Sequence, residues 1–435
     1  MSNPVVLTLL GLLATFVLIA LHVPVGVAMG IAGVVGFGLF AGFDPALAMI
    51  ASETSNNLSS LELATIPLFV LMGSFASVAG LSEDLYRLAY ALVGHRRGGL
   101  AMATIGGCAG FGAVCGSSVA TAATFGKASL PSMLSRGYSP GFAAGTVASG
   151  GTLGILIPPS SIMVIYAVLA QELIITLYIA ALVPALIAVV LHLCAITLYT
   201  RWRPQDAPTG PRATAAERWQ AARMSWPVVA LAATVIGGMA AGVFTATESA
   251  AVGAALAFAF AVGRRALTWE SLRQALLSTA TTSGMIYVLI IGASLFGYFA
   301  AVTQAPQALV ESVQASGIPV WAAVVALMAM FIVAGAVFDE VAAMVISMPF
   351  VLPLIKSWGF DPVWWGVINV VVIELGMLIP PLGMNVFVVK GVAPQIPIGA
   401  IYRGVMPYVI SNFLRLAVLL LFPVLVLWLP QALKG

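Results

Sequence analysis

Charged residues are scarce in this sequence. Lys, Arg, Asp and Glu make up 8% of its 435 residues, whereas hydrophobic residues make up 61%. A soluble domain carries roughly 25% charged residues, and no water-soluble fold could bury this much apolar surface. The composition therefore excludes a soluble protein and, with a mean hydropathy of +1.08, predicts a polytopic integral membrane protein.

Cysteine and histidine are scarce as well, with three residues of each. The cysteines match no disulfide or zinc spacing, and we expect all of them to pack among apolar neighbours: Cys108, Cys115 and Cys194. The histidines are isolated from one another, and no HExxH motif occurs. With no nucleophile beside a base and no Walker A pattern, the chain is predicted to be neither an enzyme nor directly ATP-driven.

The features of a signal peptide are missing from the first apolar run, Pro4–Leu21. No basic segment precedes it and no small-residue cleavage site follows it, so it is predicted to remain as a membrane span. Because about 20 apolar residues cross a bilayer, further spans are predicted at Pro24–Phe40, Ala64–Gly80, Leu173–Tyr199, Pro227–Gly242, Thr247–Val262, Thr281–Ala301 and Gly404–Leu429. Ser82–Arg97 is too polar to cross and is predicted to be an interfacial helix.

Two pairs of apolar segments are predicted to form re-entrant hairpins. In the first, Cys115-Gly116-Ser117-Ser118 separates Gly99–Val114 from Val119–Leu134. In the second, Phe338-Asp339-Glu340 separates Pro319–Gly335 from Val341–Ile355. Short apolar segments joined by a polar turn are typical of a chain that enters and leaves a membrane on the same side.

Each hairpin precedes a helix that proline must break. Gly141–Ala170 contains Pro158-Pro159, and Pro362–Val389 contains Pro380-Pro381, 222 residues later. Proline lacks an amide hydrogen and clashes with the preceding turn, which leaves backbone carbonyls without partners. In a bilayer such carbonyls are tolerated where they are buried in protein, line a cavity or hold an ion, so two matching breaks indicate the binding site of a transporter.

The repeat divides the chain into two units. Residues 1–200 and 226–435 are predicted to be copies of one arrangement, and a cytoplasmic connector rich in proline and arginine joins them at residues 201–225. Each copy crosses the membrane an odd number of times, so the two copies are predicted to be inverted relative to one another. The expected architecture is thus an all-α membrane protein of two inverted repeats.

The charge distribution supports the inversion. The basic segments Ser82–Arg97 and Arg264–Arg273 correspond to Gln304–Gly317 and Asp44–Glu62 of the other copy, which contain neither Lys nor Arg. Because basic loops face the cytoplasm, the N-terminus is predicted to be periplasmic. Apart from Arg415 within the last span, the cations left on the outer side are Lys356 and Lys434.

Two such hairpins and breaks are expected to form two cation sites that flank one substrate site near the midplane of the membrane. Unwound backbone offers carbonyl oxygens, and hydroxyls or carboxylates complete the shell of a hard cation. The candidates at the first site are Ser117, Ser118, Thr121, Gly151, Thr152 and Gly154. The candidates at the second site are Gly335, Asp339, Glu340, Glu374 and Gly376.

These candidates have structural alternatives. Carboxylates at membrane depth are costly and usually functional, yet Asp339-Glu340 could form a surface turn and Glu374 could pair with a cation. Serine and threonine also join membrane helices through hydrogen bonds. Both interpretations therefore stay open.

Polar residues just beyond the double prolines are candidates for substrate contact. They are Ser160, Ser161 and Asn385, for which helix capping is the alternative. Arg415 and Glu248 lie within predicted spans, where the sequence leaves their roles open.

Several segments resemble the large permease subunit of tripartite ATP-independent periplasmic (TRAP) transporters. They are IPLFVLMG at Ile66–Gly73, GVFTATESAAVG at Gly242–Gly253, and the double-proline segments Gly151–Ser160 and Glu374–Gly383. The resemblance covers essentially the whole chain. Glu340 departs from it, because a small polar residue is expected after the aspartate, and this leaves the ligands of the second cation site open.

The resemblance implies an elevator-type, sodium-driven importer, in which a domain of hairpins and broken helices moves against a fixed scaffold. It implies a small four-helix membrane subunit, expected as a separate chain because no extra N-terminal helices are present, and a periplasmic binding protein that delivers an organic anion. The implied substrates are carboxylates such as C4-dicarboxylates or sialic acid, and the implied location is the bacterial inner membrane, in contact with lipid and not with nucleic acid. A stand-alone sodium or proton symporter is the alternative, followed by a channel or membrane enzyme.

Overall fold

The structure is a computed structural model that describes residues 4–434. The side chain of Lys434, which is predicted to face outward, lies outside the described part. Within residues 4–434 every regular element is a helix and none is a strand, which confirms the predicted all-α class.

The first half consists of α1 (Pro4–Ala20), α2 (Val25–Ala41), α3 (Phe43–Ser59), α4 (Thr65–Val78), α5 (Leu81–Val93), α6 (Gly99–Cys115), α7 (Ser118–Ser135), α8 (Pro140–Leu156), α9 (Ser161–Ala170) and α10 (Ile174–Trp202). The connector contains η1 (Pro204–Asp206) and α11 (Ala215–Met224). The second half consists of α12 (Trp226–Ala232), η2 (Ala233–Gly237), α13 (Gly238–Ala240), α14 (Ala246–Gly263), α15 (Trp269–Val302), α16 (Ala305–Ala315), α17 (Val320–Val337), α18 (Glu340–Ser357), α19 (Pro362–Gly376), α20 (Met384–Val392), α21 (Ile398–Leu421) and α22 (Val424–Lys434).

The two halves repeat one order of helices. Shifted by 222 residues, the bounds of α7 become 340–357, which are the bounds of α18. The same shift turns α6 into 321–337 and α8 into 362–378, against Val320–Val337 for α17 and Pro362–Gly376 for α19. One difference is that α3 and α4 correspond to the single helix α15, which has 34 residues.

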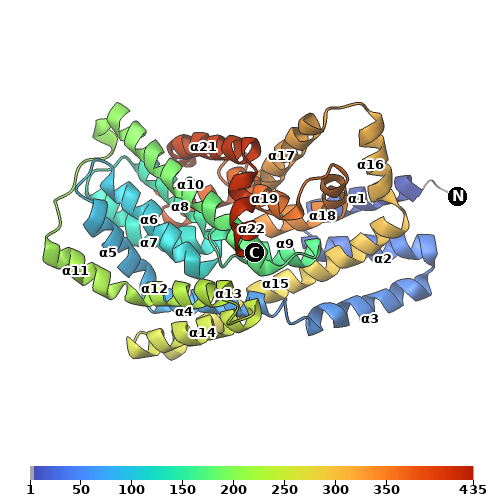
Figure 1. The fold of residues 1–435 in the computed structure, drawn as a ribbon, viewed down its shortest axis with the longest axis horizontal. Coiled ribbons are helices and arrows are strands. Elements are labelled where there is room, and N and C mark those ends of the chain that lie inside the picture. The colour runs from blue at the N-terminus through green and yellow to red at the C-terminus, as the bar shows by residue number, and fades with distance from the viewer. Residues whose placement is uncertain (1–3, 435) are drawn as a thin grey trace.

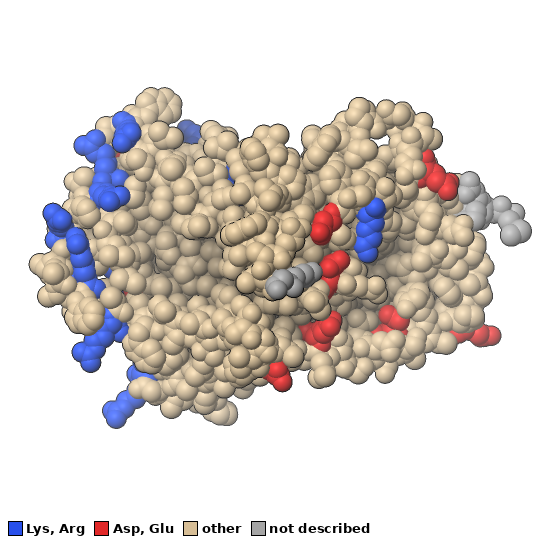
Figure 2. Space-filling view, in the orientation of Figure 1, with Lys and Arg blue, Asp and Glu red and all other residues tan. Residues whose placement is uncertain are grey.

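Equivalent elements lie at opposite ends of the molecule. In Figure 1 the first hairpin, α6–α7, lies with α5 toward the left end, whereas α16 and the second hairpin, α17–α18, lie toward the right. Figure 2 shows most Lys and Arg side chains at the left end and the visible Asp and Glu side chains over the other half. The two copies therefore point in opposite directions along an axis that separates a basic end from an acidic one.

Seven of the described helices are long and apolar enough to cross a membrane, or up to nine if each of two bent helix pairs counts as one span. One bend, of 64°, separates α4 from α5. Gly80, with φ +73°, lies at this bend in the left-handed conformation that glycine adopts readily. The bend turns α5, the predicted interfacial helix, away from the direction of α4.

The structure corrects one predicted span and adds detail to another. The closing span predicted at Gly404–Leu429 is divided, because α21 ends at Leu421 and α22 begins at Val424. Pro423 disfavours the helical conformation for the residue before it, and Phe422 has φ −129° and ψ 70°. The predicted span Pro227–Gly242 corresponds to one helix, Trp226–Ala240, which contains the π-helical turn η2 between α12 and α13.

Candidate functional site

The hairpin turns and the helix breaks meet in the interior. In the first repeat the Ser161 N–H donates to the Gly116 carbonyl across 3.4 Å, and in the second the Leu382 N–H donates to Ala336 across 3.2 Å. The repeats also contact one another, since the Ser118 hydroxyl donates to Asn385 Oδ1 across 2.8 Å. Each break is thus held against the turn of its own hairpin, and the first turn is held against the second break.

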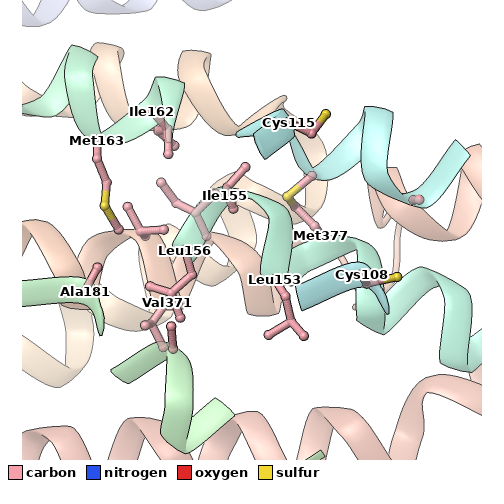
Figure 3. Close-up of a cluster of buried hydrophobic side chains, with 14 of the residues drawn as sticks. Cys108, Cys115, Leu153, Ile155, Leu156, Ile162, Met163, Ala181, Val371 and Met377 are labelled. Carbon is pink, nitrogen blue, oxygen red and sulfur yellow. The ribbon is translucent and has the colours of Figure 1, made fainter. Parts of the chain in front are cut away.

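Apolar side chains seal the space around the breaks. Figure 3 shows Met377 and Val371, from the second repeat, in one buried cluster with Leu153, Ile155 and Cys115 of the first. Packing of this kind excludes water from the surrounding backbone and raises the strength of the electrostatic interactions inside. The oxygens at the breaks therefore lie away from water. A cation can bind there only if well-placed oxygens replace the water molecules that it loses.

Three of the six candidates at the first cation site lie together. The Ser117 carbonyl accepts the Thr121 hydroxyl across 2.7 Å, at the start of α7. A methyl group on Gly154, at the end of α8, would lie 2.7 Å from that carbonyl oxygen and 2.5 Å from Thr121 Oγ1. Glycine at this position lets the carbonyl and the hydroxyl approach the backbone of the broken helix.

The other candidates of the first site have different partners. Ser118 contacts Asn385, as described above, and the Thr152 hydroxyl donates within its own helix to the Ser149 carbonyl across 2.9 Å. Gly151 packs against α7, where an added methyl group would lie 2.6 Å from the Ala122 side chain. The structure thus brings Ser117, Thr121 and Gly154 together and gives Gly151 and Thr152 packing roles.

At the second site the broken helix also lies close to its hairpin, but against the backbone of α17 rather than the start of the hairpin's second helix. A methyl group on Gly376, which matches Gly154, would lie 2.8 Å from the Gly335 carbonyl carbon. Asp339 matches Ser117 and begins α18, where its Oδ1 accepts the N–H groups of Val341 and Ala342 across 2.9 and 3.0 Å. Asp339 therefore caps the helix and is half-buried, unlike a residue of a solvated surface turn.

Glu340 brings a second carboxylate to this turn. It lies close enough to Asp339 and Glu374 for the three charges to interact, and its Oε2 is buried without a hydrogen-bond partner among the described residues. Glu340 matches Ser118, whose partner is Asn385, but the residue that matches Asn385 in the first repeat is Met163. Methionine has no amide group that could donate a hydrogen bond. Glu340 Oε2 is therefore left as an acceptor without a donor among the described residues.

Glu374 forms a buried ion pair with Arg415. Glu374 and Arg415 both expose 0% of their side chains, and Arg415 Nη2 donates to Glu374 Oε2. Glu374 therefore pairs with a cation, as the structural alternative predicts, through one of its two carboxylate oxygens. Glu374 Oε1 and the Nε and Nη1 of Arg415 have no hydrogen-bond partner among the described residues.

Arg415 belongs to a polar stripe on α21, which we define as Tyr408, Ser411, Asn412 and Arg415. Ser411 and Asn412 are adjacent and lie three or four positions from Tyr408 and from Arg415, so the four residues share one face of the helix. Each of three members bonds to a different helix: Tyr408 to Thr146 on α8 across 2.6 Å, Ser411 to His192 on α10 across 3.0 Å, and Arg415 to Glu374 on α19. The stripe is buried and joins the outer helix α21 to the core that carries the breaks.

The first repeat has no polar stripe at the matching helix position. The residues of α10 that match the stripe are Leu186, Val189, Val190 and Leu193. In the first copy the helix at this position therefore carries apolar residues at all four matching places. Polarity at this position is therefore specific to α21, although two of the partners of the stripe, Thr146 and His192, belong to the first copy. An alignment of the two copies at this position is the sequence signal that identifies the stripe.

The proposed substrate residues are engaged in the protein's own hydrogen bonds. Ser160 Oγ accepts the Met163 N–H across 3.4 Å at the start of α9, as the capping alternative predicts. The Asn385 amide bridges Ser118 and the Ala148 carbonyl, the latter across 3.1 Å. Ser161 is half-buried and contacts the first hairpin through its backbone.

Two smaller expectations are settled by the structure. Cys108 and Cys115 are buried, but Cys194 is exposed, so the packing expectation is wrong for Cys194. Glu248 accepts the Thr245 N–H across 2.8 Å in a capping box at the start of α14. Its role is local to that helix end.

Two inverted copies of a hairpin and a broken helix, with polar oxygens near the buried breaks, are an architecture typical of membrane transporters. Comparisons with known proteins identify the family of the chain. Residues 12–425 match the family described as the tripartite ATP-independent periplasmic transporter, DctM component. The chain belongs to this family, the large permease component of TRAP transporters.

Individual relatives cover nearly the whole chain. The C4-dicarboxylate TRAP transporter large permease protein DctM of Rhodobacter capsulatus is 33% identical over 98% of this chain and 99% of that protein. The sialic acid TRAP transporter large permease protein SiaM of Vibrio cholerae is 31% identical over 88% of this chain and 90% of that protein. Among solved structures, the YdaH transporter of Alcanivorax borkumensis covers 99% of both chains with a TM-score of 0.60 and 16% identity, which is a likeness of fold.

Gly154→Ala is expected to impair sodium-dependent uptake strongly, because the added methyl group would collide with the Ser117 carbonyl and the Thr121 hydroxyl. Overpacking of this kind costs roughly 1–3 kcal/mol. The matched control is Gly284→Ala on α15, where an added methyl group meets nothing within 4 Å. Uptake as a function of sodium concentration measures both, and an unchanged sodium dependence in the Gly154 variant would contradict the placement of the first site.

Proposed function

We propose that this chain imports a small organic anion across the bacterial inner membrane, coupled to the entry of sodium ions. The single observation that carries the proposal is the pair of broken helices, each held against a hairpin turn that supplies carbonyl and hydroxyl or carboxylate oxygens. Such oxygens are the ligands that hard cations prefer. In this proposal sodium is cargo that moves with the substrate.

Ser117, Thr121 and Gly154 surround the first sodium ion. Asp339 and Gly376 surround the second, with Glu340 or the free oxygen of Glu374 completing its shell. Substrate binds between the two sites, next to α9 and α20. Loading of both cation sites would fix the hairpin turns against the breaks and so prepare the substrate site, which is the physical basis of coupling between bound ions and substrate.

The transport step is proposed to be an elevator movement. The hairpins, the broken helices and their attached helices α10 and α21 would move as one body against a scaffold of α1–α4 and α12–α15. The buried stripe on α21 supports this division, because it fastens α21 to α8, α10 and α19. Substrate would thereby reach opposite sides of the membrane without a continuous pore.

The substrate is proposed to be a carboxylate delivered by a periplasmic binding protein, with a separate small membrane subunit as the second partner. The relatives named above carry C4-dicarboxylates or sialic acid, both of which are carboxylates. The basic end of the molecule is proposed to be cytoplasmic by the positive-inside rule. Since α1 begins at the opposite end (Figure 1), the N-terminus is proposed to be periplasmic.

Uptake into proteoliposomes that contain this chain and its small subunit tests the proposal. Four conditions are compared, with an inward sodium gradient or none, and with or without the cognate binding protein. We expect accumulation only when the gradient and the binding protein are both present. Uptake that ignores the binding protein would instead indicate a stand-alone symporter, and uptake that ignores sodium would refute both cation sites.

A further inference from the structure

A groove of about 740 Å³ lies between α10 and α21, with the start of α8 at one side. Its wall is largely apolar and includes Leu191, Leu198, Met406, Ile410 and Leu414. Leu198 and Ile410 each expose 65% of their side chains. In a membrane protein, apolar side chains exposed on outward helix faces contact lipid or a partner, so the groove opens toward the bilayer or toward another protein.

Two guanidinium groups lie at the basic end of this groove. Arg203 follows the end of α10, Arg403 lies in the second turn of α21, and both line the groove and are exposed. Of the ion pairs formed within residues 4–434, none includes either arginine. Asp206 also lines the groove, but its carboxylate accepts the Tyr199 hydroxyl across 2.6 Å. The groove thus offers two guanidinium groups that form no ion pair within the described residues. Beside them lies one carboxylate hydrogen-bonded to Tyr199, whose hydroxyl also interacts with Arg203.

An aromatic residue fixes the depth of this end in the membrane. Trp202 lines the groove with 78% of its side chain exposed, and the Arg203 guanidinium lies 5.4 Å from the centre of its ring. Tryptophan concentrates at the level of lipid headgroups, where its ring is partly apolar and partly wet. The two arginines therefore lie at headgroup level, and the apolar wall runs from them toward the interior of the bilayer.

We propose that this groove binds one anionic phospholipid of the cytoplasmic leaflet. The lipid phosphate lies between Arg203 and Arg403, and an acyl chain lies along Leu198, Ile410 and Leu414. A guanidinium group presents N–H donors in a planar fork that matches phosphate oxygens. Basic pockets between membrane helices on the cytoplasmic side recognise anionic headgroups in this way.

A phospholipid fits the groove better than a helix of another protein does. A helix with its side chains is about 10–12 Å across, and one seated here would cover both arginines and would need acidic residues at membrane depth to match them. A phospholipid carries an anionic headgroup and apolar chains in a single molecule. Its headgroup would face the two arginines while a chain lies along the apolar wall. The choice of the cytoplasmic leaflet rests on the orientation proposed above, whereas lipid binding itself stands whether or not the proposed transport activity is correct.

The test is native mass spectrometry of the full chain from detergent with equal amounts of phosphatidylglycerol and phosphatidylcholine. We expect wild type to retain the anionic lipid several-fold over the neutral one. Arg203→Gln with Arg403→Gln should remove that preference. Arg97→Gln with Arg223→Gln is the matched control, because both arginines are exposed at the basic end and neither lines the groove. This pair of substitutions removes the same amount of charge. The control pair should keep the wild-type ratio.

Three results would overturn the proposal. If the Arg203 and Arg403 pair keeps the wild-type ratio, or if both pairs lose it equally, then the groove does not select the headgroup. If sn-glycerol 3-phosphate displaces phosphatidylglycerol at similar concentration, the site recognises a free phosphate ester and the apolar wall contributes nothing. If the co-purified small membrane subunit displaces the lipid, the groove is a protein interface.

Discussion

Arg415→Leu is expected to destabilise the protein severely. Arg415 and Glu374 are fully buried and, within residues 4–434, form an ion pair only with one another. The substitution therefore leaves a carboxylate without its cation inside the membrane domain. Removing one partner of a buried ion pair costs about 3–5 kcal/mol, a large fraction of a typical stability of about 5–15 kcal/mol. Thermal unfolding in detergent and the yield of monodisperse protein measure the loss.

The internal repeat supplies the rescue. At the positions that match Glu374 and Arg415, the first repeat has Thr152 and Leu193. Replacing a buried ion pair with residues that pack well is often neutral or stabilising, so Glu374→Thr combined with Arg415→Leu should recover most of the stability that either single change loses. Arg273→Leu is the control, since its exposed pair with Glu270, at 3.9 Å, contributes less than about 1 kcal/mol.

The rescued double variant also separates structure from function. If Glu374 contributes its free oxygen to the second cation site, the double variant should fold and yet fail to drive uptake with sodium. Wild-type uptake by the double variant would remove Glu374 from the site. A single Arg415→Leu variant that melts at the wild-type temperature would show that the pair carries no stability at all.

The architecture was predictable because it depends on local chemistry. Two consecutive prolines remove two amide donors and clash with the turn before them, so Pro158-Pro159 and Pro380-Pro381 predict both breaks and the repeat without knowledge of any tertiary contact. Single prolines such as Pro131 and Pro184 lie within continuous helices. The Gly/Ser turn around Ser117 and the acidic turn at Asp339 likewise marked the ends of the hairpin helices. These turns are where the structure ends α6 and α17 and begins α7 and α18.

The contacts between distant segments were not predictable. Sequence chemistry identified Glu374 as a membrane carboxylate but could not choose between a cation ligand and an ion pair, because Arg415 approaches from a different helix. For the same reason the bridge from Ser118 to Asn385, which joins residues 267 positions apart, was not expected. Cys194 was assigned to the core because its neighbours in sequence are apolar, yet the lipid-facing side of a membrane helix is apolar too.

Asp339→Ala is expected to abolish sodium-dependent uptake while leaving a folded protein in the membrane. The substitution removes the carboxylate that we propose as a ligand of the second cation, and it also removes a helix cap, since Oδ1 accepts the N–H groups of Val341 and Ala342. Loss of a cap costs about 1 kcal/mol, which is too little to unfold the protein. A fall in uptake of tenfold or more, equivalent to about 1.4 kcal/mol in the barrier, should therefore accompany normal insertion and a small change in melting temperature.

Asp339→Ser distinguishes the charge from the cap. Serine is the residue that the first repeat uses at the matching position, Ser117, where it caps α7. The serine variant should therefore match wild type in thermal stability and still lose sodium-dependent uptake, because a hydroxyl cannot replace the charge of the carboxylate. Uptake restored by serine but not by alanine would mean that Asp339 acts only as a cap. In that case the second cation would have to be held by Glu340 and the backbone near Gly376 alone.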